Sequence, residues 1–177
     1  QGCRDTPAAH RQDRRQPGRR TVIPRAPGTY LLLVALAEPA ELPIGRTRRM
    51  QFDAGLYCYA GSALGPGGLA ARLGRYASGQ GRHHWHIDYL LPHATLLGAL
   101  VVEDTRRLEC RWAGWVDDRA QACVAGFGSS DCGCRGHLFR IGLAQDSNLF
   151  IASAELDLHA RWISLEQKPG SVVNRCE

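Results

Sequence analysis

An uninterrupted apolar run from Thr29 to Ala37 constrains the fold of this chain more than any other feature. Gly28 precedes the run, and Glu38-Pro39 ends it. Continuous apolar residues, without a polar residue at alternate positions, are typical of a strand that is covered on both faces. The run is also far shorter than the roughly 18 residues that a membrane-spanning helix requires. The sequence therefore predicts a central β-strand between two packed layers and argues against an integral membrane protein.

The rest of the chain alternates between strand-like and helix-like patterns. Further strands are predicted at 50–62, 94–102 and 137–141, and helices at 69–77, 85–91 and 105–116, with Thr105 as a cap and weaker helical character at 155–165. The first two strands are expected to pair as a hairpin. This order predicts an α/β domain with a small, mainly antiparallel three-stranded sheet flanked by helices. We expect this domain to span residues 28–142, between a disordered Arg-rich tail (1–27) and a C-terminal extension without an assigned role (143–177).

The positive charge of the chain is concentrated in that tail. The 177 residues carry a net charge of +5, and residues 1–27 contain seven arginines and two aspartates (7 − 2 = +5), so residues 28–177 sum to zero. A basic tail can contact nucleic-acid phosphates, or it can be a solvated leader, and the sequence leaves both interpretations open. The hydrophobic content of 44% excludes a wholly disordered chain.

The cysteine count favours a reducing compartment. The chain has seven cysteines without a repeated spacing, whereas small secreted domains usually show an even number that forms a disulfide framework. We therefore expect a cytoplasmic protein. The alternative is secretion, because Leu31–Ala37 follows an Arg-rich stretch and ends like a signal peptide.

Two sequence clusters contain residue types that are found in binding sites. Gly61–Gly68 is glycine-rich, but it lacks the Lys-Ser/Thr pair of a phosphate-binding NTPase loop. Cys132 and Cys134 with His137 offer soft ligands for Zn²⁺, but their spacing is tighter than in common zinc modules and no fourth ligand is evident. A structural role is favoured over metal binding for these three residues.

A third pattern is more specific. Gly28-Thr29-Tyr30 opens the first predicted strand and Tyr59-Ala60-Gly61 closes the second, with Arg72, His84 and Glu109 in the elements that follow. In these positions the sequence resembles the GIY-YIG nuclease superfamily. It is most similar to the uncharacterised prokaryotic branch called Uri-type endonucleases, through the blocks YAGSALG, HWHIDYLL, LEC and GFGSSDCGC…HLF. The resemblance covers roughly residues 28–140.

This resemblance implies a metal-dependent endonuclease that hydrolyses phosphodiester bonds in DNA or structured nucleic acid. It implies that Tyr30, supported by Tyr59, activates or positions the attacking water, and that Arg72 holds phosphate oxygens. Glu109 would be the protein ligand of Mg²⁺ or Mn²⁺, and His84 would relay a proton or bind phosphate. The expected partner is nucleic acid, and DNA is favoured over RNA. No membrane partner is expected.

Less specific interpretations of the same residues remain. The tyrosines can be half-buried sheet residues, Arg72 can belong to a solvated helix face, and Glu109 can be a surface charge. His84 can also pair with Asp88 at helical spacing. The alternative function is a catalytically inactive nucleic-acid-binding module on the same fold, and a third hypothesis is a zinc-stapled adaptor built on Cys132, Cys134 and His137.

Overall fold

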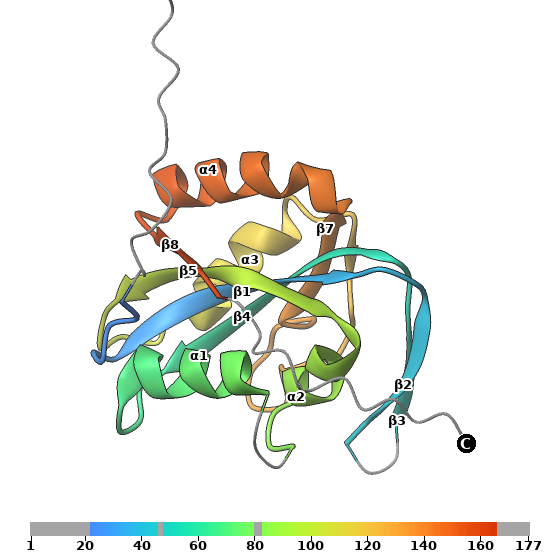
Figure 1. Cartoon of the computed structure of the whole chain (residues 1–177), viewed down its shortest axis with the longest axis horizontal. Coiled ribbons are helices and arrows are strands. Elements are labelled where there is room, and N and C mark those ends of the chain that lie inside the picture. Colours follow the sequence, from blue (N-terminus) through green and yellow to red (C-terminus); the bar gives the residue numbers. More distant parts are fainter. Residues whose placement is uncertain (1–21, 46–47, 80–82, 166–177) are drawn as a thin grey trace, which may run out of the picture.

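The computed structural model describes residues 22–45, 48–79 and 83–165, which build three layers around a six-stranded antiparallel sheet (Figure 1). The strand order is β6-β7-β4-β1-β5-β8. The strands are β1 (Gly28–Leu36), β4 (Gly55–Ala63), β5 (Thr95–Glu103), β6 (Ala122–Cys123), β7 (Leu138–Gly142) and β8 (Arg161–Ser164). The prediction of a mainly antiparallel sheet is confirmed. The predicted number of three strands is wrong, because β6 and β7 extend the sheet beside β4 and β8 extends it beside β5.

The predicted central strand is confirmed as β1. It pairs with β4 on one side and with β5 on the other. Leu32 and Val34 face a core shared with the first helix, whereas Leu31 and Leu33 face a second core with Trp112. Because both faces of β1 are covered, nearly every position in it is apolar.

The helices cover the two faces of the sheet (Figure 1). One face carries α1 (Gly68–Ser78), the short α2 (Ile87–Leu90) and the 3₁₀ turn η1 (Leu91–His93); the other carries α3 (Glu109–Asp117), the 3₁₀ turn η2 (Ala144–Asp146) and α4 (Ser147–Asp157). The helix predicted from Thr105 begins instead at Glu109. The weak helix predicted at 155–165 lies earlier in the chain as α4, and β8 follows it. No described helix is long and apolar enough to cross a membrane.

The predicted strand at 50–62 is two strands. β3 (Arg48–Phe52) pairs with β2 (Ala40–Ile44) in a separate two-stranded sheet, which projects as an arm in Figure 1. β4 then begins at Gly55 and pairs with β1, as the predicted hairpin partner should. The burial patterns differ in the same way: β3 is largely exposed, whereas β4 is buried along nearly its whole length.

Residues at both ends of the described chain pack on this fold. The amide of Leu69 donates to the Ala26 carbonyl at 3.0 Å, and the amide of Ala70 donates to the Pro24 carbonyl at 2.9 Å. These bonds satisfy N–H groups in the first turn of α1, which have no partner within the helix. At the other end, β8 places residues 161–164 in the main sheet. The remaining parts of the predicted tail and extension, residues 1–21 and 166–177, lie outside the described residues.

Candidate functional site

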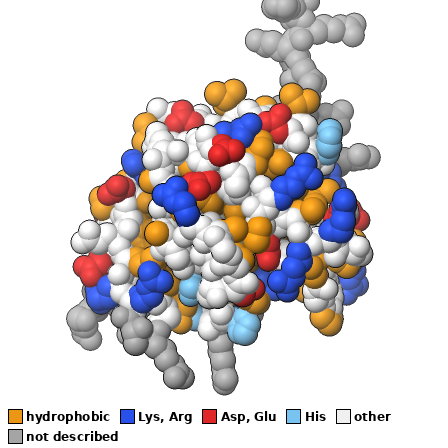
Figure 2. All heavy atoms as spheres, turned by 180° about the vertical axis from the view of Figure 1, so that it is seen from behind, with side chains coloured by type: hydrophobic (Ala, Val, Ile, Leu, Met, Phe, Trp, Pro, Cys, Tyr) orange, Lys and Arg blue, Asp and Glu red, His pale blue; other side chains and the backbone are white. Residues whose placement is uncertain are grey.

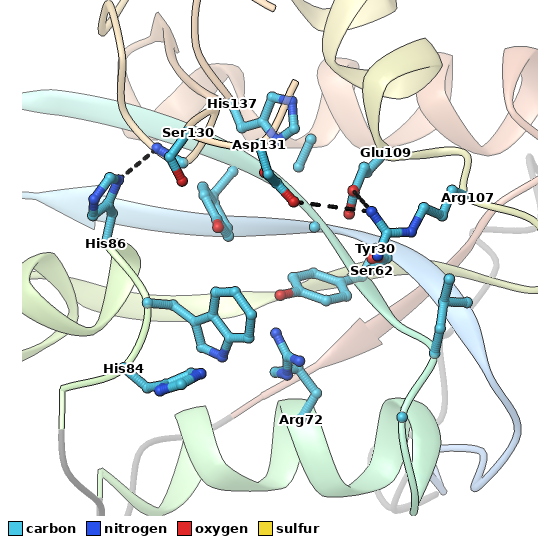
Figure 3. Close-up of a pocket in the computed structure, with 17 residues that line it drawn as sticks. Tyr30, Ser62, Arg72, His84, His86, Arg107, Glu109, Ser130, Asp131 and His137 are labelled. Carbon is cyan, nitrogen blue, oxygen red and sulfur yellow. Dashed lines mark hydrogen bonds and ion pairs between the residues drawn. The ribbon is translucent and has the colours of Figure 1, made fainter. Parts of the chain in front are cut away.

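A pocket of about 390 Å³ opens at the end of β4, where β7 stops pairing with it. β7 begins at Leu138, opposite Tyr59, so the β4 residues beyond this point border the pocket instead of another strand. All five residues that the sequence singled out as catalytic line this one pocket: Tyr30, Tyr59, Arg72, His84 and Glu109. Figure 3 shows that they come from opposite sides of it, with Arg72 and His84 across from Glu109.

The two tyrosines lie on one face of the sheet. Tyr30 pairs in register with Gly61, and Tyr59 pairs with Leu32, so the two side chains are diagonal neighbours on β1 and β4. A Cβ atom on Gly61 would overlap the phenol of Tyr30. The glycine of the second tripeptide is therefore needed so that the Tyr30 ring can lie over the backbone of β4.

Arg72 reaches from α1 toward a pair of buried phenols. The hydroxyls of Tyr30 and Tyr76 are 2.9 Å apart. Burial lowers the pKa of the Arg72 guanidinium, but the facing phenols of Tyr30 and Tyr76 outweigh this effect and raise it above the usual value. Burial raises the pKa of Tyr30 and of Tyr59 well above the usual phenol value, and Arg72 only partly offsets this. Both phenols are therefore neutral at pH 7, while Arg72 is charged.

Asp88 fixes the segment that carries His84. Its carboxylate accepts hydrogen bonds from the backbone amides of His84 and Trp85, both at 2.8 Å, and pairs with Arg75 at 2.9 Å. The predicted partnership of His84 and Asp88 thus exists, but it uses the His84 backbone. The Trp85 ring lies 4.5 Å from the Arg72 guanidinium, in cation–π contact.

Two carboxylates converge on the opposite side of the pocket. Glu109, at the first turn of α3, and Asp131, in the loop before β7, both lie 3.9 Å from the same Arg107 nitrogen (Figure 3). The carboxylate of Glu109 is 15% exposed and that of Asp131 is 68% exposed. The sequence singled out Glu109 alone, because Asp131 is separated from it by 21 residues of intervening chain.

His86 joins the two sides. The amide of Gly128 donates to Nδ1 of His86 at 2.7 Å. Burial lowers the pKa of His86 and the nearby Arg48 lowers it further, so the imidazole is neutral and its Nδ1 accepts this bond. Gly128 has a φ of 74°, and a Cβ there would come within 2.8 Å of the Tyr59 ring, which explains the glycine.

A four-residue cluster that can hold a metal adjoins the carboxylate side. Cys110, Cys132, Cys134 and His137 each offer one ligand atom, and these atoms all lie within 4.8 Å of one another. Cys110 is the fourth residue of this cluster, and the sequence did not reveal it. It lies 22 residues before Cys132 in the chain, and only the packing of α3 beside the loop brings it near.

We call the side that carries Tyr30, Tyr59, Arg72 and Tyr76 the α1 wall, and the side that carries Glu109, Asp131 and the cysteine–histidine cluster the α3 wall. The α1 wall presents a cation and phenol hydroxyls, which bind phosphate oxygens. The α3 wall presents carboxylates, which bind hard divalent cations. By contrast, Figure 2 shows basic and acidic side chains intermingled over one whole face of the protein, without a single-sign patch there.

The fold and the pocket define a class: a three-layer α/β protein with a polar pocket of mixed charge at the end of its central strands. The family model described as "Domain of unknown function DUF123" matches residues 29–159, and the chain belongs to this family. The match begins within the first tripeptide and extends past α4. No curated protein and no solved structure matches the chain.

Proposed function

We propose that this protein is a metal-dependent endonuclease that hydrolyses phosphodiester bonds in DNA or structured nucleic acid, as its resemblance to GIY-YIG nucleases implies. One observation carries the proposal: five residues chosen from separate parts of the sequence line a single pocket. The opposite charges are also separated, because the cationic Arg72 and the carboxylate of Glu109 lie on opposite walls of the pocket (Figure 3). Metal-dependent hydrolysis of a phosphodiester uses both groups: the cation binds the phosphate oxygens, and the carboxylate binds the metal ion.

The donor set of the α3 wall fits Mg²⁺ or Mn²⁺. Both ions prefer oxygen ligands, and Mg²⁺ is commonly held by one or two carboxylates plus water and substrate oxygens. Glu109 and Asp131 supply two such carboxylates around one Arg107 nitrogen. A bound divalent ion supplies Lewis-acid stabilisation of the charge that develops on the leaving oxygen. Arg107 would then exchange part of its contact with the carboxylates for contact with substrate.

The α1 wall binds and orients the reacting phosphate. The guanidinium of Arg72 is charged and its planar fork can hold two phosphate oxygens. Since the phenols of Tyr30 and Tyr59 are neutral, they donate hydrogen bonds and position the attacking water rather than remove its proton. His84 is exposed at the pocket mouth, and its imidazole can relay a proton or bind phosphate there.

The second candidate is a non-catalytic nucleic-acid-binding module. The raised pKa values of Tyr30 and Tyr59 favour it, because neither phenol is ionised at pH 7 to act as a base. The two candidates differ in their need for a divalent ion. The enzyme requires the ion to turn over, whereas the binding module retains nucleic acid in the presence of a chelator.

The test is cleavage of labelled duplex, flap, bubble and single-stranded DNA and of structured RNA, with Mg²⁺, Mn²⁺ or chelator. Removing one charge-stabilising donor typically lowers the turnover rate by roughly 10²–10³, and we expect this for Arg72→Ala. Glu109→Gln should also lower the turnover rate, because it removes a carboxylate proposed to bind the divalent ion. Arg161→Ala and Glu103→Gln are the matched controls, because this pair lies on the surface 3.8 Å apart and lines no part of the pocket. The controls should cleave like the unchanged protein.

Each other outcome rejects the enzyme. Binding without cleavage on every substrate would favour the binding module. Equal cleavage by the unchanged protein and by both pocket variants would assign the activity to a contaminant.

A further inference from the structure

Three thiols and an imidazole meet beside the pocket without a role in the proposed chemistry. We propose that Cys110, Cys132, Cys134 and His137 bind one structural Zn²⁺ ion. Cys110 lies in the first turn of α3, Cys132 and Cys134 lie in the loop before β7, and His137 directly precedes β7. This assignment does not depend on the endonuclease proposal, because it uses a different set of ligand atoms.

The distances suit a tetrahedral site. With zinc bonds of about 2.3 Å to sulfur and 2.1 Å to nitrogen, tetrahedral geometry separates a sulfur from a nitrogen ligand by about 3.6 Å and two sulfurs by about 3.8 Å. The His137 Nε2 atom lies 3.4 Å from the sulfur of Cys132 and 4.0 Å from that of Cys110. All four ligand atoms lie within 4.8 Å of one another, so small side-chain adjustments place one ion at bonding distance from all of them.

The ligand chemistry selects zinc. Three soft thiolates with one imidazole form a Cys₃His set, which is a common structural zinc site, whereas Mg²⁺ and Mn²⁺ prefer oxygen. Four protein ligands also close the coordination sphere, so no position remains for a catalytic water. On binding, the three thiols release their protons to solvent and the thiolates bind the ion.

A disulfide explains the cluster less well than a metal does. Five cysteines are described and all are free thiols. A disulfide joins two sulfurs, so it would leave the third thiol of the cluster and His137 without a role. The other two described cysteines, Cys58 and Cys123, lie outside the cluster. Cys123 is half-buried in β6 and comes near the loop at Gly136, so it provides a matched control within the same region.

The ion would order the α3 wall. It would join the start of α3, the loop before β7 and the start of β7. α3 and β7 already share a buried apolar core through Trp112 and Phe139, whereas the loop contributes few buried side chains. Glu109 immediately precedes Cys110, and Asp131 immediately precedes Cys132. Zinc at the cluster therefore holds the two carboxylates in position relative to each other. This positioning role, unlike zinc binding itself, rests on the proposed function.

The test begins with the metal content of the full chain, purified without chelator or added metal. We expect one zinc per chain, no stoichiometric iron, and fewer reactive thiols before denaturation than after it. Exchange with Co²⁺ should give the intense visible absorption of a tetrahedral thiolate site. Cys132→Ser and Cys110→Ser should lose the ion and this absorption, whereas Cys123→Ser should keep both.

A further variant separates metal binding from folding. Cys110 is exposed, so replacing it should disturb packing little, and Cys110→His supplies another zinc ligand at the same place. We expect Cys110→His to retain zinc that Cys110→Ser has lost. A metal-free protein whose cluster thiols react before denaturation, a disulfide within the cluster, or iron in place of zinc would overturn the assignment. So would equal zinc content in the serine variants and the unchanged protein.

Discussion

The α1 wall is anchored in the hydrophobic core, whereas the loop that carries Asp131, Cys132 and Cys134 on the α3 wall is held mainly by polar contacts. Tyr30 and Tyr76 are fully or almost fully buried, and α1 buries Leu69 and Leu73 against the sheet beneath them. Residues 126–136 contain few buried positions, of which Phe127 is the one large apolar side chain. The loop is instead closed by backbone bonds such as that from the Gly126 amide to the Arg135 carbonyl, at 2.6 Å.

This difference shows how one pocket can combine a preformed side with one that needs a ligand. Burial of apolar surface fixes the α1 wall as soon as the chain folds. The loop 126–136 of the α3 wall lacks comparable burial, so its order should depend on a metal that crosslinks it to α3 and β7. We therefore expect perturbations of the two walls to have separate and distinguishable effects.

The largest effect should come from removing zinc. Structural zinc contributes on the order of 10 kcal/mol to the folding free energy of small zinc modules. Here this free energy would stabilise the α3 wall. We expect amide hydrogen exchange, measured by mass spectrometry, to accelerate in residues 126–137 after zinc removal and to stay unchanged in β1 and β4. Equal acceleration in both regions would contradict the comparison.

A smaller loss of stability is expected for Asp88→Ala on the other side of the pocket. The substitution leaves Arg75 and two backbone amides without their carboxylate, and breaking a buried ion pair costs about 3–5 kcal/mol. Urea unfolding should show this loss with zinc still bound. Asp53→Ala is the control: its pair with Arg140 spans 3.9 Å and the carboxylate is 80% exposed, so it should cost under about 1 kcal/mol.

Tyr76→Phe should have a more moderate effect, because it removes one buried hydrogen bond. The Tyr30 hydroxyl then loses its partner at 2.9 Å, at a cost of about 1–3 kcal/mol in unfolding free energy. Tyr57→Phe is the matched control, since Tyr57 is as buried as Tyr76. Its hydroxyl donates to the backbone carbonyl of Asp53, an exposed residue, where water can replace the bond. If both variants lose equal stability in urea unfolding, the hydrogen bond between the two buried phenols contributes no more to the unfolding free energy than the Tyr57 bond does.

The smallest effect concerns the bond that joins the walls. The pKa of His86 is lower in the folded protein than in the unfolded chain, through burial and Arg48. Its contribution to stability is therefore present above about pH 6.5, the unperturbed value, and is lost as the pH falls through the folded pKa. Protonation also removes Nδ1 as an acceptor for the Gly128 amide.

We expect urea unfolding of His86→Gln to depend less on pH between about 7.5 and 5 than that of the unchanged protein. His93→Gln, at an exposed position of η1, should retain the full dependence. Identical pH profiles for all three proteins would contradict a role for His86.

Much of the fold follows from local patterns. The apolar run of β1, the helical spacing of α1 and the strand β5 were all predictable, because each pattern reflects which faces of that element are covered. The division of residues 50–62 was missed. The largely exposed pattern of β3 gives way to an almost fully buried pattern from Gly55 onward, and this change marks where the chain enters the main sheet.

The sequence by itself determined which residues could line a pocket, because two tripeptides at strand ends and three polar residues beyond them form an ordered pattern. Only the tertiary structure decided which other residues lie next to them in the folded protein. Asp131 joins Glu109, and Cys110 joins Cys132, Cys134 and His137, because α3 packs next to the loop before β7. Contacts between segments more than 20 residues apart depend on how the layers pack, and no local periodicity encodes them.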